Sequence, residues 1–438
     1  MPEQQQTLTI QQALDLAVQH HTAGRLPQAE SIYNQILQSD PDQPVALHLL
    51  GVIAHQVGKN DVAVDLINKA LAIKPDYAEA HSNLGNALKE QGKLDEAVAS
   101  YHKALAIKPD FAEAHYNLSF ALLNKGRLKE GLDEYEWRWR VRAAGLSLRR
   151  FTRPMWDGTA DLCGRTILLW PEQGPYDVTV WASCVPEMVA RAGHCILEVQ
   201  PKLVPLFARS FVEAEVRADS REQGAEPTDF DFHLPMGSLY RHLRPDLAAA
   251  AEPKAYLVPD PDRIAFWKAR LAALGPGPFV GISWKSPLIT PTRSPNYTRM
   301  GDWKPVFGKQ AQFVNLQCRD YRDDLAEAKR EFGVTVHDFE DLDLYDDLDD
   351  VAALAGALDV AISVHTCVSA ITAGVGTPTW RIAWRQNSWN NFLFIPRAPS
   401  MASFERDTGE TWDGVFAAIA GRLQDLIDAR TGGTGARP

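Results

Sequence analysis

The chain has 438 residues, with 45 Lys and Arg against 56 Asp and Glu, which gives a formal net charge of −11 at pH 7. A hydrophobic fraction of 45% with 23% charged residues is typical of folded globular proteins, and the length predicts about three domains. The acidic balance disfavours nucleic-acid binding. The sequence contains no apolar run of about 18 residues, so no membrane span is predicted. The opening MPEQQQTLTI does not resemble a secretory signal, and we expect a cytoplasmic protein.

Small residues and prolines recur every 34 residues in the first third of the chain. The period is kept by Pro41, Pro75 and Pro109 and by Gly24, Gly58, Gly92 and Gly126. This is the spacing of the tetratricopeptide repeat (TPR), in which two antiparallel helices pack closely and a proline turn closes the unit. We predict an α-helical TPR solenoid of about four repeats over residues 1–145, with helices near 9–23, 27–39, 44–57, 61–73, 78–91, 95–107, 112–125 and 128–142.

A stack of such repeats leaves a concave groove lined by the first helix of each repeat. Asn83 and Asn117 lie one repeat apart on that helix, and Asn86 lies one turn after Asn83. The segment NLGNALKEQGKLDEA resembles the repeats of protein O-GlcNAc transferases, where asparagines form a ladder that holds a peptide; Leu49 interrupts that ladder here. Two roles stay open for these asparagines: binding an extended peptide backbone, or bridging adjacent helices.

After the repeats, the basic segment RVRAAGLSLRRFTRP leads to Trp156-Asp157-Gly158. We expect residues 146–160 to be a linker whose arginines are solvated or pack a domain surface. Short apolar runs then alternate with helical patterns, which predicts parallel βαβ units. Strands are predicted at 166–170, 195–199, 229–234, 279–283, 312–316, 335–339, 360–364 and 379–383, and helices near 178–191, 267–274, 320–332 and 346–358. We predict two Rossmann-like α/β domains, 161–262 and 263–438, with a ligand at the carboxyl ends of their strands.

Three segments resemble a known family. PMWDG and GRTILLWPEQGPYD are similar to the first domain of heptosyltransferase-like GT-B glycosyltransferases, whose loop is commonly EQGxGD. VGISWKS resembles the first strand of their second domain, and LDVAISVHTCVSAITAGVGTPTW resembles their donor-site segment. With the repeats in front, the chain is most similar to bacterial proteins associated with flagellin glycosylation, which attach nonulosonic (sialic-acid-like) sugars to Ser or Thr.

The resemblance implies a GT-B fold, in which two Rossmann-like domains face a cleft, and an inverting, metal-independent glycosyltransferase. Its donor would be a nucleotide-activated nonulosonic acid, CMP-linked, with no cofactor. Its acceptor would be flagellin, or flagellin with a chaperone, recruited by the TPR groove. No nucleic-acid or membrane partner is implied.

Asp177 stands at the aspartate of the EQGxGD loop, in which Gly174 also lies. The resemblance makes Asp177 the general base that accepts the proton of the acceptor hydroxyl; an ordinary helix-capping aspartate is the alternative. Tyr176 replaces the second glycine of the family loop. This departure leaves open a loop of different shape, or lost activity.

Donor-binding residues are expected after strands of the second domain. Ser283 and Lys285 follow or end the strand 279–283, and a lysine there can neutralise a phosphate or can be a plain surface residue. His365 and Thr366 end the strand 360–364 and begin a helix of small residues that includes Ser369, where backbone amides can hold a phosphate.

His365 stands where the family has aspartate, and Ala370 stands where it has histidine. These changes disfavour an ADP-heptose donor. A histidine beside the leaving group suits a CMP-linked donor, because it can donate a hydrogen bond to developing negative charge. A structural histidine is the alternative.

Three further features follow the predicted strands. Gln317 follows strand 312–316 and, in the resemblance, faces the nucleotide. Asn296 and Tyr297 lie in a proline-rich loop that can close over donor or acceptor. The polar and aromatic residues 384–391 can stack on a sugar or base, or can pack a domain surface.

The segment 338–350 contains eight acidic residues in thirteen. We favour the start of a helix, where negative charge offsets the dipole, over a metal site. The five cysteines contain no CxxC pair, so neither a disulfide framework nor a zinc site is expected. Two other functions stay open: a non-catalytic TPR adaptor with a degenerate GT-B domain, and a heptosyltransferase-like enzyme with a carbohydrate acceptor.

Overall fold

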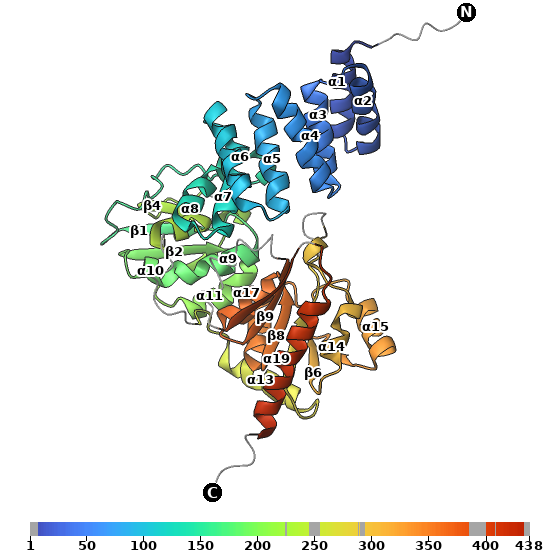
Figure 1. Cartoon of the computed structure of the whole chain (residues 1–438). Coiled ribbons are helices and arrows are strands. Elements are labelled where there is room, and N and C mark those ends of the chain that lie inside the picture. The colour runs from blue at the N-terminus through green and yellow to red at the C-terminus, as the bar shows by residue number, and fades with distance from the viewer. Residues whose placement is uncertain are drawn as a thin grey trace, which may run out of the picture. The chain divides into compact units, whose positions relative to one another are not determined.

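The computed structural model describes residues 8–223, 226–244, 255–287, 289, 294–384, 400–407 and 409–432 (Figure 1). The chain divides into two compact units, Met1–Gly145 and Leu146–Pro438. Residues 146–160, which we expected to be a linker, are grouped with the second unit, where the side chains of Arg149 and Trp156 are buried.

The first unit is an array of antiparallel helix pairs, as the 34-residue period predicts. Its helices are α1 (Ile10–Thr22), α2 (Leu26–Ser39), α3 (Pro44–Gln56), α4 (Asn60–Ile73), α5 (Ala78–Glu90), α6 (Leu94–Ile107), α7 (Ala112–Asn124) and α8 (Leu128–Tyr135). The last helix ends at Tyr135 rather than near residue 142, and the chain continues in the 3-10 turns η1 (Glu136–Arg140) and η2 (Arg142–Ala144). There the fully buried Arg138 lies over the rings of Tyr135 and Trp139, at 4.5 and 4.3 Å from their centroids.

Glycines shape each repeat in two ways. Gly92 ends α5 in the left-handed region with φ 76°, which lets the Lys93 N–H donate to the carbonyl of Leu88 and close the helix. Gly85, inside α5, allows α6 to approach closely, because a Cβ at this position would lie 2.6 Å from the ring of Tyr101.

We therefore expect Gly85→Ala to destabilise the chain by about 1–2 kcal/mol, because overpacking at a filled contact outweighs the better helix propensity of alanine. Gly421→Ala is the matched control: Gly421 is exposed in a long helix, and a Cβ there meets nothing within 4 Å. It should leave stability unchanged or raise it by up to about 1 kcal/mol. Urea unfolding of the full chain measures both, and equal effects would refute close packing at Gly85.

The second unit begins with a four-stranded parallel sheet of order β3-β2-β1-β4. Its strands are β1 (Thr166–Trp170), β2 (His194–Val199), β3 (Glu215–Ala218) and β4 (Phe232–Pro235). Between and after them come α9 (Pro175–Trp181), η3 (Ala182–Cys184), α10 (Val185–Val189), η4 (Pro201–Leu203), α11 (Val204–Ser210), η5 (Ser220–Gln223), η6 (Met236–Ser238) and α12 (Leu239–Leu243). The helix predicted at 178–191 is broken by η3, and Pro186, which has no N–H, lies in the first turn of α10. The polar strand β3 was not predicted.

A six-stranded parallel sheet of order β10-β9-β8-β5-β6-β7 follows. Its strands are β5 (Phe279–Ser283), β6 (Gln312–Asn315), β7 (Val336–His337), β8 (Val360–Val364), β9 (Thr379–Trp384) and β10 (Met401–Arg406). The helical elements are α13 (Pro261–Ala272), η7 (Ser294–Asn296), η8 (Met300–Trp303), α14 (Lys304–Phe307), α15 (Arg322–Phe332), α16 (Leu348–Ala357), α17 (Cys367–Gly374) and α19 (Asp413–Gly432). The sheet separates two apolar clusters, one around Trp303 and Phe416 and one around Trp267 and Leu354. The prediction of helical repeats followed by α/β structure with parallel sheets is confirmed.

The strand order has a consequence for function. The chain winds outward from β5 to β7, returns to β8 beside β5, and then winds outward the other way to β10. In sheets wound in this order, ligands bind at the carboxyl ends of the two strands where the direction reverses. Here those strands are β5 and β8, whose residues Ser283 and Ser363 are paired.

No helix in the described ranges has the length and hydropathy of a membrane span.

Candidate functional site

The turn after β5 is held by Gln317. The side-chain oxygen of Gln317 accepts hydrogen bonds from the Ser283 hydroxyl at 3.2 Å and from the backbone N–H groups of Trp284 and Lys285 at 3.2 and 3.0 Å. Gln317 is only 1% exposed. Gln317, which follows β6, therefore holds the end of β5 in place. The Ser283 hydroxyl is used in this hydrogen bond.

Lys285 has an acidic partner within the fold. Its ammonium group contacts Asp324 of α15 at 2.6 Å, and the indole N–H of Trp284 donates to the same carboxylate oxygen at 2.8 Å. The lysine side chain is 24% exposed. A phosphate would have to share this cation with Asp324, which makes Lys285 a weaker phosphate partner than its sequence position predicts.

His365 and the start of α17 lie at the carboxyl end of β8. Thr366 and Ser369 cap the helix: the Thr366 N–H donates to the Ser369 hydroxyl at 3.2 Å, and that hydroxyl donates to the Thr366 carbonyl at 2.7 Å. Ser369 is thus engaged in the cap. His365 and the first residues of α17 follow β8 directly, and their role in holding a phosphate stays a prediction.

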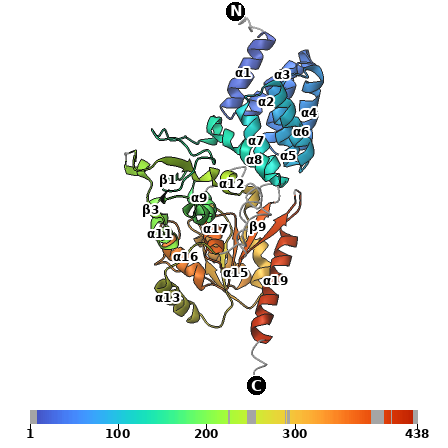
Figure 2. The same cartoon turned by 90° about the vertical axis from the view of Figure 1, so that its left-hand side faces the viewer.

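The loop after β1 brings α9 against this same end of the second sheet. Helices α9 and α17 pack side by side (Figures 1 and 2). The ring of Tyr176 meets the ring of His365 edge-on, with centroids 4.2 Å apart. The structure therefore joins the EQG loop and the β8 end in one site, and Tyr176, where the related loop has glycine, forms the contact.

Asp177 lies in the first turn of α9, which begins after Gly174, and its side chain is half-buried. Gly174 offers no side chain to cap this helix, so the Asp177 carboxylate is the negative charge in its first turn. Burial raises the pKa of the Cys367 thiol at the start of α17 to about 12, and Asp177 is one of the charges that add to this rise. Asp177 is therefore within electrostatic reach of the start of α17.

Sequence reasoning missed Arg381 on β9. It pairs in register with Ser363 on one side and Ser403 on the other, so a polar row crosses four strands from Ser283 to Ser403. Arg381 is 1% exposed. The signal was present in the strand TWRIAW, because a central parallel strand is normally apolar throughout.

The proline-rich loop and the acidic segment have structural partners. Asn296 accepts the backbone N–H of Trp384 at 3.1 Å, and Tyr297 packs against the core of the second sheet. Residues 385–391 of the predicted polar-aromatic cluster lie outside the described residues.

The acidic residues of segment 338–350 begin α16, as expected. Asp347 caps the helix, while Asp349 and Asp350 pair with Arg209 and Arg263. Within the described ranges, no group of three or more His, Cys, Asp or Glu is arranged to hold a metal.

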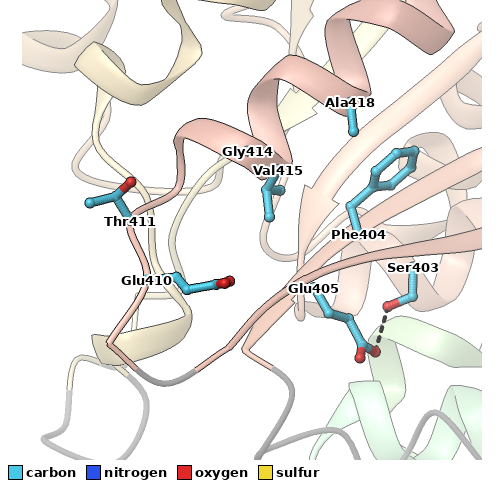
Figure 3. A pocket seen from close by; sticks show the side chains of 8 residues that line it. All are labelled: Ser403, Phe404, Glu405, Glu410, Thr411, Gly414, Val415 and Ala418. Carbon is cyan, nitrogen blue, oxygen red and sulfur yellow. Dashed lines mark hydrogen bonds between the residues drawn. The ribbon is translucent and has the colours of Figure 1, made fainter.

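A pocket of about 560 Å³ lies between β10 and the start of α19 (Figure 3). It is lined by Ser403, Phe404, Glu405, Glu410, Thr411, Gly414, Val415 and Ala418. Ser403 and Glu405 also border Arg381, so the pocket adjoins the polar row but does not include the residues predicted from the sequence.

In the first unit, two of the three predicted asparagines bridge helices. Asn83 bonds His48 of α3 at 2.8 Å, and Asn86 accepts the Tyr101 hydroxyl of α6 at 2.7 Å. The side chain of Asn117 is half-buried, and no hydrogen bond joins it to another described residue. Bridging thus accounts for Asn83 and Asn86 in this structure, and peptide binding stays a prediction.

His48 connects this bridge to the preceding turn, because its other ring nitrogen bonds the Tyr77 hydroxyl at 2.9 Å. Burial lowers the pKa of His48 from 6.5 to about 4; Glu79 opposes this shift, and His21 adds to it. The unfolded chain therefore binds more protons than the folded chain between those values, and stability falls as the pH drops from about 6.5 toward 4.

We expect His48 to contribute about 2 kcal/mol to the loss of unfolding free energy between pH 7.5 and pH 5. His48→Asn should lower stability at pH 7.5 and reduce the pH dependence by that amount, as measured by urea unfolding of the full chain. His233, which is also buried and has its pKa lowered to about 4, serves as internal reference because the substitution leaves it unchanged. An unaltered pH profile in the variant would contradict this role.

Comparison with known proteins supports the repeats and gives one long match. A TPR repeat model matches residues 54–92 and 85–126, and a tetratricopeptide repeat model matches residues 11–35. This chain contains tetratricopeptide repeats. Protein FlbA of Caulobacter vibrioides is 33% identical over 313 residues, which is 68% of this chain and 52% of that protein. The chain thus spans about half the length of this curated relative.

Two solved structures each match 30% of the chain, with low TM-scores. A crystal structure of MamA is 23% identical over 30% of this chain and 77% of its own, with a TM-score of 0.28. A crystal structure of the APC/C hetero-tetramer Cut9–Hcn1 is 21% identical over 30% of this chain and 27% of its own, with a TM-score of 0.29.

Proposed function

We propose that this chain is a protein O-glycosyltransferase of the GT-B type, in which the second unit transfers a nonulosonic sugar from a nucleotide-activated donor to Ser or Thr of flagellin. One observation carries the proposal. The start of α9, which holds Asp177, packs against the carboxyl end of β8, beside the reversal point of a doubly wound sheet. This packing supports the proposal, because it would let a carboxylate that follows the first sheet act on a nucleotide bound at the end of β8.

On the donor side, the amides at the start of α17 and the imidazole of His365 favour a phosphate at the end of β8. We assign the nucleotide to CMP because His365 replaces the aspartate of the related heptosyltransferases. As the bond from the anomeric carbon to the phosphate oxygen breaks, a hydrogen bond from His365 stabilises the charge that develops on the leaving group.

On the acceptor side, Asp177 acts as general base. Its carboxylate accepts the proton of the Ser or Thr hydroxyl while that oxygen forms the new bond to the anomeric carbon. Attack opposite the departing phosphate inverts the configuration. The proposed chemistry uses protein side chains and the donor, without a cofactor or metal.

The TPR array supports recruitment of a protein, because a repeat array presents an extended groove for a polypeptide. Flagellin, alone or with a chaperone, is the partner we propose. A cytoplasmic location belongs to the same proposal, and five cysteines that form no disulfide favour a reducing compartment.

Thermal unfolding of the full chain with CMP, UDP, GDP or ADP tests the donor assignment. A nucleotide at 100 times its Kd adds about 2.7 kcal/mol to stability. We expect CMP to give the largest rise in Tm, and His365→Ala to remove it; Lys285→Ala should reduce it only partly because Asp324 shares that cation. Selectivity for ADP would replace this proposal with a heptosyltransferase-like enzyme acting on a carbohydrate.

A non-catalytic TPR adaptor is the second candidate. It is favoured by the same contacts that fill the site: Tyr176 covers His365, and Asp324 neutralises Lys285. An adaptor would show no change in Tm with any of the four nucleotides, while still binding its protein partner.

A further inference from the structure

Arg381 is a buried cation whose hydrogen-bonding capacity is incompletely used. A guanidinium group carries five N–H donors. Nη2 donates to the Ser403 hydroxyl at 3.2 Å, whereas Nε has no hydrogen-bond partner among the described residues. A buried polar group normally has its partners. Arg149 and Arg406 also have an Nε without a hydrogen-bond partner among the described residues, so Arg381 is set apart by its burial together with the weak pairing of its charge.

Among the residues that the structure describes, the charge of Arg381 is also incompletely balanced. The nearest carboxylate oxygen of Glu405 is 3.9 Å from Nη2, beyond hydrogen-bond distance, and that oxygen instead accepts the Ser403 hydroxyl at 3.0 Å. Burial lowers the pKa of Arg381, and Tyr176 and Glu405 act against this shift. Burying a guanidinium away from water without a close anion costs free energy. An anion other than Glu405 would therefore bind favourably beside Arg381.

The position of Arg381 indicates which anion that is. Arg381 pairs with Ser363, two residues before His365, and Tyr176 is within interaction range of both Arg381 and His365. On the same strand, Thr379 bonds Thr372 of α17 at 2.9 Å, so this face of β9 is the one that α17 covers. Arg381, His365 and the first amides of α17 thus border one place, and all three favour negative charge.

We infer that Arg381 is the receptor for an oxyanion of the nucleotide-linked sugar, either its phosphate or the carboxylate of the sugar. This inference rests on the proposed function, and it adds a residue that binds the donor. The bound oxyanion takes the free Nε donor and displaces the weak contact with Glu405. Tyr176 then shields the bound oxyanion from solvent, which would explain why a tyrosine stands at this position.

Calorimetric titration of the full chain tests this with four probes: CMP-N-acetylneuraminate, CMP, N-acetylneuraminate and inorganic phosphate. Arg381→Lys keeps the charge but loses the planar fork, and should raise the Kd for CMP-N-acetylneuraminate about tenfold or more. Arg406→Lys on β10 is the matched control. Its guanidinium donates to the carbonyls of Glu410 and Pro295, and its substitution should leave the Kd unchanged.

Glu405→Gln provides a test that impaired folding cannot imitate. Removing the competing carboxylate should lower the Kd for CMP-N-acetylneuraminate about threefold or more, because the oxyanion no longer shares Arg381. A higher or unchanged Kd in Glu405→Gln, or an unchanged Kd in a folded Arg381→Lys, overturns the inference. If Arg381→Lys weakens CMP as much as the whole donor, the anion is the phosphate; if it weakens only probes with the sugar, the anion is the carboxylate.

The proposed function and the inference fail in different ways. Tight donor binding that neither variant changes leaves the transferase proposal standing and overturns the role of Arg381. Binding of phosphate that depends on Arg381, without any binding of CMP or the donor, keeps the anion site and removes the CMP-sugar function. No binding of any of the four probes to the wild-type chain overturns both.

Discussion

Asp177→Asn should lower the rate of sugar transfer to the acceptor protein by about 100-fold or more, the usual contribution of a positioned general base. Asparagine keeps the shape of the side chain but cannot accept the hydroxyl proton. The carboxylate lies in the first turn of α9, so its loss should cost at most about 1 kcal/mol of stability through the helix dipole. Transfer from CMP-N-acetylneuraminate to flagellin is measured under single-turnover conditions, together with donor affinity, which should change little.

Asp262→Asn is the matched control for this substitution. Asp262 also follows a proline in the first turn of a helix, α13, but is exposed and lies outside the site. It should show a similar small loss of stability and no loss of transfer. If Asp177→Asn transfers sugar at the wild-type rate, Asp177 is only a first-turn carboxylate and the proposed mechanism is wrong.

The repeat array was predictable because its signal is periodic. Gly92 and its equivalents every 34 residues mark the end of each first helix, and the structure places them in the left-handed conformation that only glycine adopts readily. The strands TILLW, FVGIS and VAISV were equally clear, since buried parallel strands are short apolar runs. The polar edge strand β3 lacks such a run, and the sequence pattern missed it.

The candidate site was predictable only in part. Asp177 and His365 were singled out by the resemblance of their segments to the EQGxGD loop and the donor-site segment of the heptosyltransferase-like family, and both segments follow strands, where parallel sheets place their ligands. The partners of Lys285 and Gln317 could not be found this way, because Asp324 and Ser283 come from other parts of the chain and meet them only after folding. Arg381 was missed because it lies inside a strand, where a charge is not expected until the neighbouring strands are known.

The same limit applies to residues 146–160. The arginines of this segment are typical of a solvated linker, and Glu198, the partner of Arg149, lies inside the apolar strand HCILEV. In the structure, Arg149 donates to Glu198 at 2.7 Å and to the Ser220 hydroxyl at 2.6 Å, and all three residues are buried. A segment with this network is part of the fold of the second unit.

Arg149→Met should therefore destabilise the chain by about 3 kcal/mol, because it leaves the buried Glu198 carboxylate without its principal cation. Arg217 still donates to Glu198 at 3.2 Å, which keeps the loss at the low end of the range for broken buried pairs. Adding Glu198→Gln should recover at least about 1 kcal/mol relative to the sum of the two single substitutions, since the uncompensated charge is gone. Urea unfolding of the second unit within the full chain gives these energies.

An exposed pair in the same unit sets the scale for comparison. Arg165 lies 3.7 Å from Asp231, and their side chains are 60% and 38% exposed, so Arg165→Met should cost less than about 1 kcal/mol. A loss of about 3 kcal/mol for Arg149→Met against this small loss would establish that residues 146–160 fold with the second unit. Equal losses at the two positions would mean that Arg149 is solvated, as a linker residue would be. The first sheet, whose strand β1 leads into α9 and Asp177, would then be stable without residues 146–160.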